Sequence, residues 1–331
     1  MAIPATITII TPSFNQGHYL EQTIDSVLSQ NYPNLEYIII DGGSTDQSVE
    51  IIKKYEKHLA YWVSEPDKGQ SEAINKGLRR ASGEIVNWIN SDDYYEPDAL
   101  RTVAAAFEDE QVNVVCGRGK IITEDGIFIR HSRGTDVYEG NLAKTIGWAR
   151  MDQPETFFRK SALNRIGLLS ENLHYLMDRD LWLRYLFLFG LDGVKKISDV
   201  LINFRLHESS KTVSQKEKFQ IDHDSFYFSI AKQYDLLESK EMISHLCSVH
   251  HNFTLALPQD YSKVEIEKIL SYYFLKRADE FYANYERAKA KACLSQVNTV
   301  HLAATEKKLF KKLNFRNTFV PVSLIQYFRK S

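Results

Sequence analysis

The stretch from Glu84 to Tyr95 most strongly constrains the fold, because an apolar run there ends abruptly in two carboxylates. Residues 85–89 predict a buried β-strand, and Asn90-Ser91-Asp92-Asp93 follow it directly. In open α/β sheets, ligands bind at the carboxyl ends of the strands. Adjacent acidic oxygens at that edge suit a hard divalent cation that also holds phosphate oxygens. The alternative is that Asp92 and Asp93 cap a helix beginning near residues 97–100.

The rest of the first hundred residues alternates between short apolar runs and helical patterns. Apolar runs cover residues 7–12 and 37–40, and helical spacing follows each of them. This order predicts parallel strands in a doubly wound sheet covered by helices on both faces. Farther on, Asp125-Gly126 between two apolar runs predicts a hairpin. The predicted fold class is therefore α/β, with a mostly parallel but mixed sheet.

Bulk composition excludes several classes of protein. The chain has 331 residues, of which 44% are apolar and 25% charged, so a large core can form. A net charge of −2 disfavours nucleic acid as a partner. Three widely spaced cysteines predict free thiols in a reducing compartment. Neither a signal peptide nor an apolar run of about 18 residues is present, so a cytoplasmic location is predicted.

Polar clusters end the predicted strands at one edge of the sheet. Thr11-Pro12-Ser13 ends the first strand and Asp41-Gly42-Gly43 the second, while Asp67 stands in a loop before a predicted helix. Each cluster suits a ligand, although glycines also serve turns and Asp67 could equally cap its helix. Neither a Gly-x-Gly-x-x-Gly fingerprint nor a Walker loop is present. Any nucleotide must therefore be held by carboxylates and a metal ion.

Five motifs, taken in order, resemble those of the inverting family-two nucleotide-sugar glycosyltransferases, which have the GT-A fold. They are Thr11-Pro12-Ser13-Phe14-Asn15, Asp41-Gly42-Gly43-Ser44-Thr45-Asp46, Glu65-Pro66-Asp67-Lys68-Gly69, Ala81-Ser82-Gly83-Glu84 and Asn90-Ser91-Asp92-Asp93. The resemblance covers about residues 5–212. It implies a Rossmann-like GT-A domain over residues 1–215, and helical spacing predicts an appended helical region over residues 216–331.

The resemblance also implies roles for individual residues. The expected nucleotide contacts are Thr11, Pro12, Ser13, Asp41, Asp67 and Asp92, with Asn15 and Lys68 as secondary candidates. The expected ligands of a Mn²⁺ or Mg²⁺ ion are Asp92, Asp93 and His207, and Lys211 is a candidate cation for the diphosphate. The chain departs from the family at Asn90, where many relatives carry aspartate.

A catalytic base is expected at the start of a strongly apolar predicted helix. Asp178 and Asp180 both stand there, where the helix dipole alone favours negative charge. Inverting transfer needs a group that removes the proton of the acceptor hydroxyl. In the resembled family this base is an aspartate just before such a helix, so Asp178 is the expected base and Asp180 the cap. Gln153 is a further site candidate.

The function that the resemblance implies is metal-dependent transfer of a hexosyl or related group. A UDP- or dTDP-linked sugar would be transferred with inversion to the hydroxyl of a glycan or lipid-linked acceptor, in surface polysaccharide or glycan assembly. One alternative is a sugar-phosphate nucleotidyltransferase, which would need a Gly-rich basic loop that residues 11–17 do not provide. Another is a non-catalytic glycan- or nucleotide-binding module, which the presence of Asp178 disfavours.

The C-terminal tail is basic and rich in aromatic residues. After Glu306 it contains no acidic residue, and its cations are Lys307, Lys308, Lys311, Lys312, Arg316, Arg329 and Lys330. This pattern predicts a membrane-surface segment, which would make the protein peripheral on the inner membrane face. A helix packed on the domain and a homodimer contact are the competing interpretations.

Overall fold

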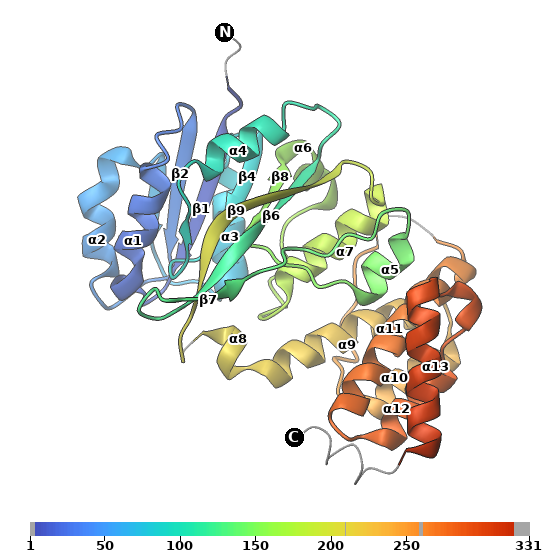
Figure 1. Cartoon of the computed structure of the whole chain (residues 1–331). Helices are drawn as coiled ribbons and strands as arrows, with labels where there is room; N and C mark the ends of the chain where they lie inside the picture. The colour runs from blue at the N-terminus through green and yellow to red at the C-terminus, as the bar shows by residue number, and fades with distance from the viewer. Residues whose placement is uncertain (1–3, 209, 258–260, 321–331) are drawn as a thin grey trace. The chain divides into compact units, whose positions relative to one another are not determined.

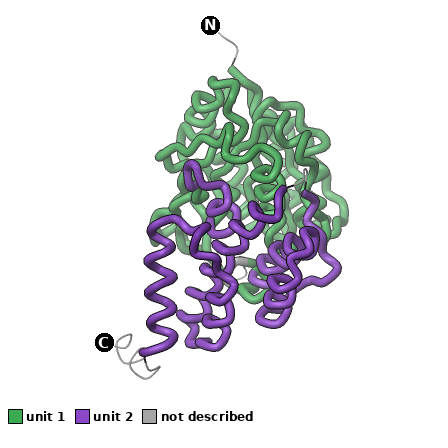
Figure 2. The backbone as a smooth tube through the Cα atoms, turned by 90° about the vertical axis from the view of Figure 1, so that its right-hand side faces the viewer, with its two compact units in different colours: residues 1–137, 150–219 green, residues 138–149, 220–331 purple. Residues whose placement is uncertain are grey.

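The structure is a computed structural model that describes residues 4–208, 210–257 and 261–320. The chain divides into two compact units, which Figure 2 distinguishes by colour. Unit 1 comprises residues 1–137 and 150–219, and unit 2 comprises residues 138–149 and 220–331. The sequence predicted a single boundary after residue 215, whereas the short segment 138–149 groups with the later helices.

Unit 1 is built around a mixed β-sheet (Figure 1). Its strands are β1 (Ile7–Ser13), β2 (Leu35–Asp41), β3 (Tyr61–Ser64), β4 (Ile85–Trp88), β5 (Tyr94–Tyr95), β6 (Val114–Thr123), β7 (Phe128–His131), β8 (Thr156–Arg159) and β9 (Val194–Leu206). Neighbours follow the order β3-β2-β1-β4-β8-β6-β9-β5, and β7 pairs with β6. Strands β1 to β4 are parallel, and β8 runs antiparallel to both β4 and β6. The predicted mostly parallel, mixed sheet is confirmed.

Helices cover the parallel strands, which agrees with the largely apolar sequences of β1, β2 and β4. The helices of unit 1 are α1 (Gly17–Leu28), α2 (Ser48–Tyr55), the 3₁₀ turn η1 (Glu56–His58), α3 (Gln70–Arg80), α4 (Ala99–Ala106), α6 (Lys160–Ile166), α7 (Met177–Phe189) and α8 (Lys211–Ser214). Every residue of β1 is buried, as expected for a strand with both faces covered. Gly77 lets α3 lie close on β1, because a Cβ there would stand 2.5 Å from Ile10 Cγ2.

The strand that ends in Asp92 and Asp93 is followed by a short strand rather than by a helix they could cap. After β4, the chain forms the two-residue strand β5, which pairs with β9. The residue at the N-cap of α4 is Asp98, so the helix-capping interpretation of Asp92 and Asp93 is wrong. The predicted hairpin is confirmed, because β6 and β7 pair antiparallel around Gly126, whose φ is +83°.

Unit 2 is helical, as predicted. It contains α5 (Leu142–Trp148), most of α9 (Lys216–Gln233), α10 (Leu237–Leu246), α11 (Lys263–Ala283), α12 (Arg287–Ser295), the 3₁₀ turn η2 (Thr299–His301) and α13 (Ala304–Phe319). A capping box between Ser262 and Glu265 begins the long helix α11. Helix α5 packs closely on α11, because a Cβ on Gly147 would stand 2.3 Å from the Ile269 carbonyl oxygen.

The structure bears on the predicted membrane location, on the basic tail and on the cysteines. Among the described helices, none has both the length and the apolar character needed to cross a bilayer. Of the basic tail, residues 307–316 lie on α13, whereas Arg329 and Lys330 lie outside the described residues. Cys116, Cys247 and Cys293 are free thiols, as predicted.

Candidate functional site

A cavity of about 600 Å³ lies at the carboxyl ends of β1 and β4. The chain leaves β1 to form β2 and β3 on one side, whereas β4 lies on the other, so these two strands flank a switch point of the sheet. The cavity is lined by residues from four of the five motifs, by the start of α7 and by the segment after β9. Sequence positions from 12 to 219 therefore converge on one pocket within unit 1.

The ends of β1 and β2 divide their residues between lining the pocket and supporting its loops. Pro12, Ser13 and Gly42 line the pocket. Thr11 is fully buried, and its hydroxyl lies 3.0 Å from the Tyr37 hydroxyl. Asp41 is also fully buried. Its carboxylate accepts hydrogen bonds from the backbone of Gly43 and Ser44 and from the side chains of Ser44 and Ser64. Thr11 and Asp41 thus hold the loops that Pro12, Ser13 and Gly42 present to the pocket.

Asn15 connects the first two of these loops. Its side-chain oxygen accepts from the backbone N–H of Thr45 at 2.8 Å, and its own backbone N–H donates to Ser44 Oγ at 2.8 Å. Asn15 has a φ of 51°, a left-handed conformation that asparagine tolerates better than most residues. The side chain of Asn15, a secondary site candidate from the sequence, therefore connects the two loops and is not among the residues that line the pocket.

Asp67 and Gly42 form a tight pair on one wall of the pocket, and Lys68 lies beside them. A Cβ on Gly42 would stand 2.7 Å from Asp67 Oδ2, so only glycine leaves room for the carboxylate. The backbone N–H of Gly69 donates to Asp67 Oδ1 at 2.8 Å. Burial raises the pKa of Asp67 despite this hydrogen bond. The other oxygen of Asp67, Oδ2, lies against Gly42 in the turn after β2, and both residues line the pocket.

Asp92 and His207 form a second pair in the lining of the pocket. Asp92 Oδ2 and His207 Nε2 are 3.0 Å apart, and both residues line the pocket. His207 is brought there by the end of β9, and its ring packs on the ring of Tyr19, with centroids 5.0 Å apart. The His207 side chain is only 2% exposed, whereas that of Asp92 is 20% exposed. The His207 ring is therefore enclosed, while the Asp92 carboxylate remains accessible from the pocket.

Arg205 fixes the loop that carries Asp92. Its backbone N–H donates to Asp93 Oδ1 at 2.9 Å, and its Nε donates to the Asp92 carbonyl oxygen at 3.0 Å. The guanidinium also donates to Gln22 Oε1 at 2.6 Å and to the Glu124 carbonyl oxygen. One side chain thus ties the Asp92 loop to α1 and to the β6–β7 hairpin.

Asp93 differs from Asp92 in both exposure and partners. It is 1% exposed, and besides Arg205 it accepts from Asn90 Nδ2 at 3.4 Å. Burial and the neighbouring charge of Asp92 raise the pKa of Asp93 well above its ordinary value. Asp93 does not line the pocket. Its position suits support of the loop, whereas Asp92 lines the pocket.

The residues around Asp92 fit a divalent cation that also binds diphosphate. Within the described chain, no group of three or more His, Cys, Asp or Glu side chains has metal-binding geometry. Asp92 Oδ2 and His207 Nε2 are at hydrogen-bond distance, 3.0 Å. Adjacent ligand atoms of an octahedral ion with bonds of about 2.1 Å would have a similar spacing. Mg²⁺ and Mn²⁺ accept carboxylate, water and phosphate oxygens as ligands. Two protein ligands with an open side therefore suit an ion that the donor helps to hold.

A chain of polar contacts links Lys211 to Asn90 across the pocket. Lys211 Nζ donates to Gln70 Oε1 at 3.1 Å, and Gln70 Nε2 donates to Asn90 Oδ1 at 2.7 Å. All three residues line the pocket. The sequence analysis did not identify Gln70. Its position as the first residue of the helix after the Asp67 loop could have indicated that it lies near the site. Asn90 thereby serves as an acceptor of a hydrogen bond, which an aspartate could also do.

Asp178 lines the pocket from the first turn of α7. Its Oδ1 accepts from the backbone N–H of Arg179 at 2.7 Å. Burial raises the pKa of Asp178 to about 6, and the charge of Asp152 adds to this shift. Asp180 has a different environment, because it is buried and Arg184 donates to its Oδ2 through Nη2 at 2.7 Å. The predicted capping role of Asp180 is wrong, because the N-cap residue of α7 is Leu176 and Asp180 pairs with Arg184 one turn farther along the helix. Of the two carboxylates, Asp178 is the one that lines the pocket.

Gln153 is bound to β4 and lines the same pocket as Asp178. Its Nε2 donates to Asn87 Oδ1 at 2.8 Å and to the Trp88 carbonyl oxygen at 2.7 Å. These two bonds fix the amide group at the wall of the pocket, which Gln153 lines. Two acidic residues adjoin Gln153, the half-buried Asp152 and the buried Glu155. Ser132 Oγ lies 3.0 Å from Asp152 Oδ2 and 2.9 Å from Glu155 Oε1. Burial and the charge of Asp152 raise the pKa of Glu155 to about 7.

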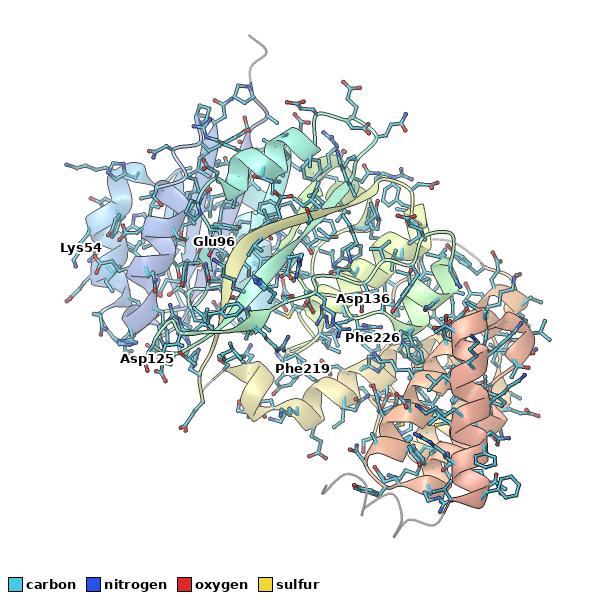
Figure 3. All side chains as sticks on the ribbon, in the orientation of Figure 1. Lys54, Glu96, Asp125, Asp136, Phe219 and Phe226 are labelled. Carbon is cyan, nitrogen blue, oxygen red and sulfur yellow. The ribbon has the colours of Figure 1, made fainter. Side chains whose placement is uncertain are left out.

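Aromatic side chains form the wall next to Asp178. Tyr175 and Phe219 have ring centroids 5.3 Å apart, and both line the pocket together with His174 and Met177. Figure 3 labels Phe219, which lies far along the chain from the five motifs. The sequence did not predict this wall, because nothing in the local pattern at residue 219 indicates its contact with Tyr175.

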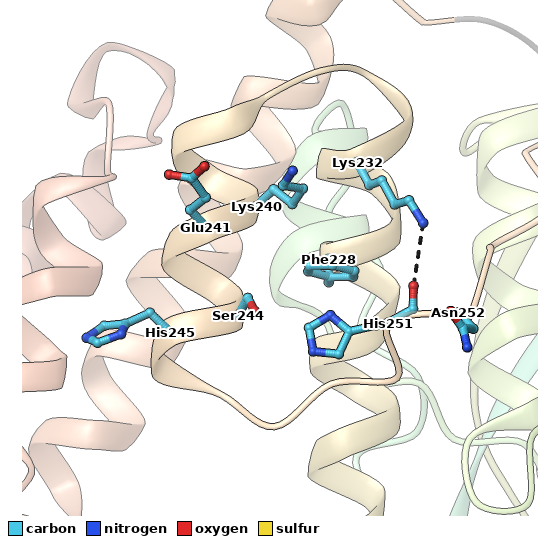
Figure 4. Close-up of a pocket in the computed structure, with 8 residues that line it drawn as sticks. All are labelled: Phe228, Lys232, Lys240, Glu241, Ser244, His245, His251 and Asn252. Carbon is cyan, nitrogen blue, oxygen red and sulfur yellow. Dashed lines mark hydrogen bonds between the residues drawn. The ribbon is translucent and has the colours of Figure 1, made fainter.

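A second pocket lies within unit 2 and contains none of the five motifs (Figure 4). It has a volume of about 690 Å³ and is bounded by α9, α10 and the segment after α10. Lys232 Nζ donates to the His251 carbonyl oxygen at 3.5 Å across its edge. The chemistry predicted from the sequence therefore belongs to the pocket in unit 1.

Comparisons with known proteins agree with this geometry. The family model described as glycosyl transferase family 2 matches residues 8–167. An uncharacterized glycosyltransferase of Mycobacterium tuberculosis is 30% identical over 191 residues, which are 56% of this chain and 70% of that protein. The putative teichuronic acid biosynthesis glycosyltransferase TuaG of Bacillus subtilis is 41% identical over 99 residues, which are 28% of this chain and 38% of TuaG.

Solved structures share the fold. The crystal structure of S. aureus TarS 1-349 in complex with UDP-GlcNAc has a TM-score of 0.57 and 20% sequence identity. The superposition covers 94% of this chain and 86% of that chain, so the helical region is included. At this identity the likeness concerns the fold, while the family assignment rests on the family model and the sequence relatives. The chain therefore belongs to glycosyl transferase family 2 and has the GT-A fold.

Proposed function

We propose that this glycosyltransferase transfers a sugar from a UDP- or dTDP-linked donor to an acceptor hydroxyl, with inversion at the anomeric carbon. The observation that carries the proposal is that Asp67, Asp92 and Asp178 line one pocket from three directions. One carboxylate lies at the backbone turn after β2, one beside a histidine and one at the start of a helix. These positions suit the nucleoside, the diphosphate and the reacting hydroxyl, respectively.

The donor would bind with its nucleoside against the ends of β1 and β2. Pro12, Ser13, Asp67 and Lys68 would contact it directly, whereas Thr11 and Asp41 would act through the loops they hold. Ser13 supports this assignment, because its hydroxyl is buried and has no hydrogen-bond partner among the described residues. A buried unpaired hydroxyl is costly unless a ligand or water completes it.

The diphosphate would lie between Asp92 and Lys211. We propose that a Mn²⁺ or Mg²⁺ ion binds to Asp92 and His207, with Asp93 holding the loop behind them. Such an ion neutralises charge that develops on the leaving diphosphate. Lys211 is positioned through Gln70 to contribute a second positive charge. Arg205 would keep the Asp92 carboxylate in place, because it donates to the Asp92 carbonyl oxygen and to the side chain of Asp93.

Asp178 would act as the general base. The acceptor oxygen attacks the anomeric carbon and forms the new glycosidic bond while its proton passes to the Asp178 carboxylate. The bond from the anomeric carbon to the phosphate oxygen breaks, and its electron pair leaves with the nucleoside diphosphate. A raised pKa improves Asp178 as a proton acceptor near neutral pH. The aromatic wall of Tyr175 and Phe219 would receive the acceptor, a glycan or lipid-linked saccharide in surface polysaccharide assembly.

The pH dependence follows from the pKa of Asp178. The base must be ionised to accept a proton, so kcat/KM should fall about tenfold per pH unit below about pH 6. Above that value, the same group should leave the rate unchanged. Initial rates of nucleotide release between pH 5 and pH 8 measure the profile, with circular dichroism confirming that the protein stays folded. A rate that is constant from pH 5 to pH 7 would exclude Asp178 as the base.

Stereochemistry tests the inverting mechanism directly. With a UDP-sugar whose anomeric linkage is α, we expect the product to be the β-glycoside. Proton NMR of the early product distinguishes the two anomers by the coupling constant of the anomeric proton. An α-product would show retention and overturn the single-displacement role of Asp178, while leaving the family assignment intact.

A further inference from the structure

Helix α13 has a buried face that packs within unit 2. Leu313 is 1% exposed, and Glu306 and Asn317 are also buried. Glu306 forms an ion pair with Lys144 of α5 at 2.9 Å, and Arg287 of α12 donates to the carbonyl oxygens of residues 316 and 317. The expectation of a packed C-terminal helix therefore applies to this face.

The opposite face of α13 is exposed and combines cations with aromatic rings. Lys308, Lys312, Phe315 and Phe319 follow one another at helical spacing, so they form a single stripe along the helix. Phe315 is 59% exposed and Phe319 is 69% exposed, and their rings pack together with centroids 5.2 Å apart. Lys307, Lys311 and Arg316 flank the stripe and are also exposed. Figure 1 shows α13 as the last labelled helix of the chain.

No exposed acid on α12 or α13 balances these charges. Residues 287–320 contain eight Lys and Arg residues and a single acidic residue, Glu306. That residue is buried and already paired with Lys144. Just before α12, Glu286 pairs with Lys289 at 2.6 Å. The outer face of α13, defined as Lys307, Lys308, Lys311, Lys312, Phe315, Arg316 and Phe319, is therefore positively charged as a whole.

We propose that the outer face of α13 binds the surface of an anionic phospholipid bilayer. The lysines would contact lipid phosphates, and the paired phenylalanines would insert among the acyl chains just below the headgroups. Charge complementarity favours this partner over a second copy of the chain. In a two-fold dimer the same patch meets itself, which would place these cations opposite one another. The proposal is independent of the donor site, since every residue it uses lies outside the unit 1 pocket.

Vesicle sedimentation of the full chain tests the proposal. We expect pelleting with phosphatidylcholine vesicles that contain one quarter phosphatidylglycerol, and little pelleting with phosphatidylcholine alone. Each cation near an anionic surface contributes about fivefold to binding, so Lys308→Glu/Lys312→Glu should weaken partitioning at least ~25-fold. Raising the salt concentration should also weaken it, because the Debye length shortens. Phe315→Ser/Phe319→Ser should weaken it by roughly tenfold even at low salt.

A matched variant separates local binding from net charge. Lys53→Glu/Lys57→Glu changes the charge equally on two exposed lysines of α2 and η1, and it should pellet like the wild type. Melting curves should be unchanged for all three variants, since every altered side chain is exposed. Equal pelleting of the wild type with both vesicle types, or equal loss in the α2–η1 variant, would overturn the proposal. Equally strong binding to single-stranded DNA, or a dimer that Lys308→Glu/Lys312→Glu dissociates, would assign the face to another partner.

Discussion

Replacing Asp178 by asparagine should reduce kcat for sugar transfer by about 10²–10⁴-fold, the range expected when a general base is lost. Asparagine keeps the size of the side chain but cannot accept the proton of the acceptor hydroxyl. Nucleotide binding should stay within about twofold of the wild type, because Asp178 belongs to the first turn of α7 and not to the strand-end loops that would hold the nucleotide. Initial rates of nucleotide release and calorimetric titration with UDP measure the two quantities on one preparation.

A matched control for this variant is Asp125→Asn. Asp125 is an exposed carboxylate in the turn between β6 and β7, labelled in Figure 3. The Asp125→Asn variant carries the same chemical change outside the pocket. Its kcat should match that of the wild type. An Asp178→Asn enzyme that retains more than about a tenth of wild-type kcat would contradict the assignment of the base. A parallel loss of UDP affinity would instead indicate that Asp178 contacts the donor.

The second large effect is expected at Asp92. Asp92→Asn removes a negative charge from the pair with His207 and should lower the Mn²⁺-dependent affinity for UDP by at least about tenfold. The physical reason is that a neutral amide binds a divalent cation much more weakly than a carboxylate does. Titration of UDP in the presence of Mn²⁺ and then of EDTA measures how much of the binding depends on the metal.

Asp98→Asn provides the control for Asp92. Asp98 is exposed and has a φ of 59°, a conformation that asparagine adopts readily, so this variant should bind UDP normally. If wild-type UDP affinity were the same with Mn²⁺ and with EDTA, the Asp92–His207 pair would not hold an ion that serves the donor. His207→Ala should also lower the Mn²⁺-dependent part of the UDP affinity.

The strand ends were predictable because local sequence determines them. Apolar runs that stop at polar residues fix where β1, β2 and β4 end, and the parallel order brings those ends to one edge. The pocket lined by Pro12, Gly42 and Asp92 follows from that logic. Whether a polar side chain at a strand end points into the pocket is a tertiary property. Thr11 and Asp41 therefore could not be distinguished from Ser13 by sequence alone.

Long-range contacts account for what the sequence did not predict. Arg205 fixes the Asp92 loop from the end of β9, and Phe219 reaches the wall beside Tyr175. Each contact joins residues far apart in the chain. The local sequence around Arg205 and around Phe219 does not predict which residues they contact. The same holds for α5, whose place beside α11 depends on a close approach at Gly147.

Asp92 and Asp93 show most clearly what the sequence cannot predict, because the two neighbours differ in burial and in hydrogen-bond partners. Adjacent carboxylates after a strand look equivalent in the sequence, yet one is 1% exposed and bound to the Arg205 backbone. The other meets His207 at the pocket wall. Both residues lie in the short segment between β4 and β5, where no regular strand pattern sets which side chain turns inward. Arg205, which is more than a hundred residues farther along the chain, donates to the buried Asp93 carboxylate.

A crystal structure with UDP and Mn²⁺ tests the central claim, that this pocket is the donor site. We predict an anomalous manganese signal in contact with Asp92 and His207, a diphosphate between that ion and Lys211, and the uracil ring near Gly42 and Asp67. The Asp178 carboxylate should remain uncovered by the nucleotide. Nucleotide bound elsewhere, or manganese that does not contact Asp92, would contradict the account.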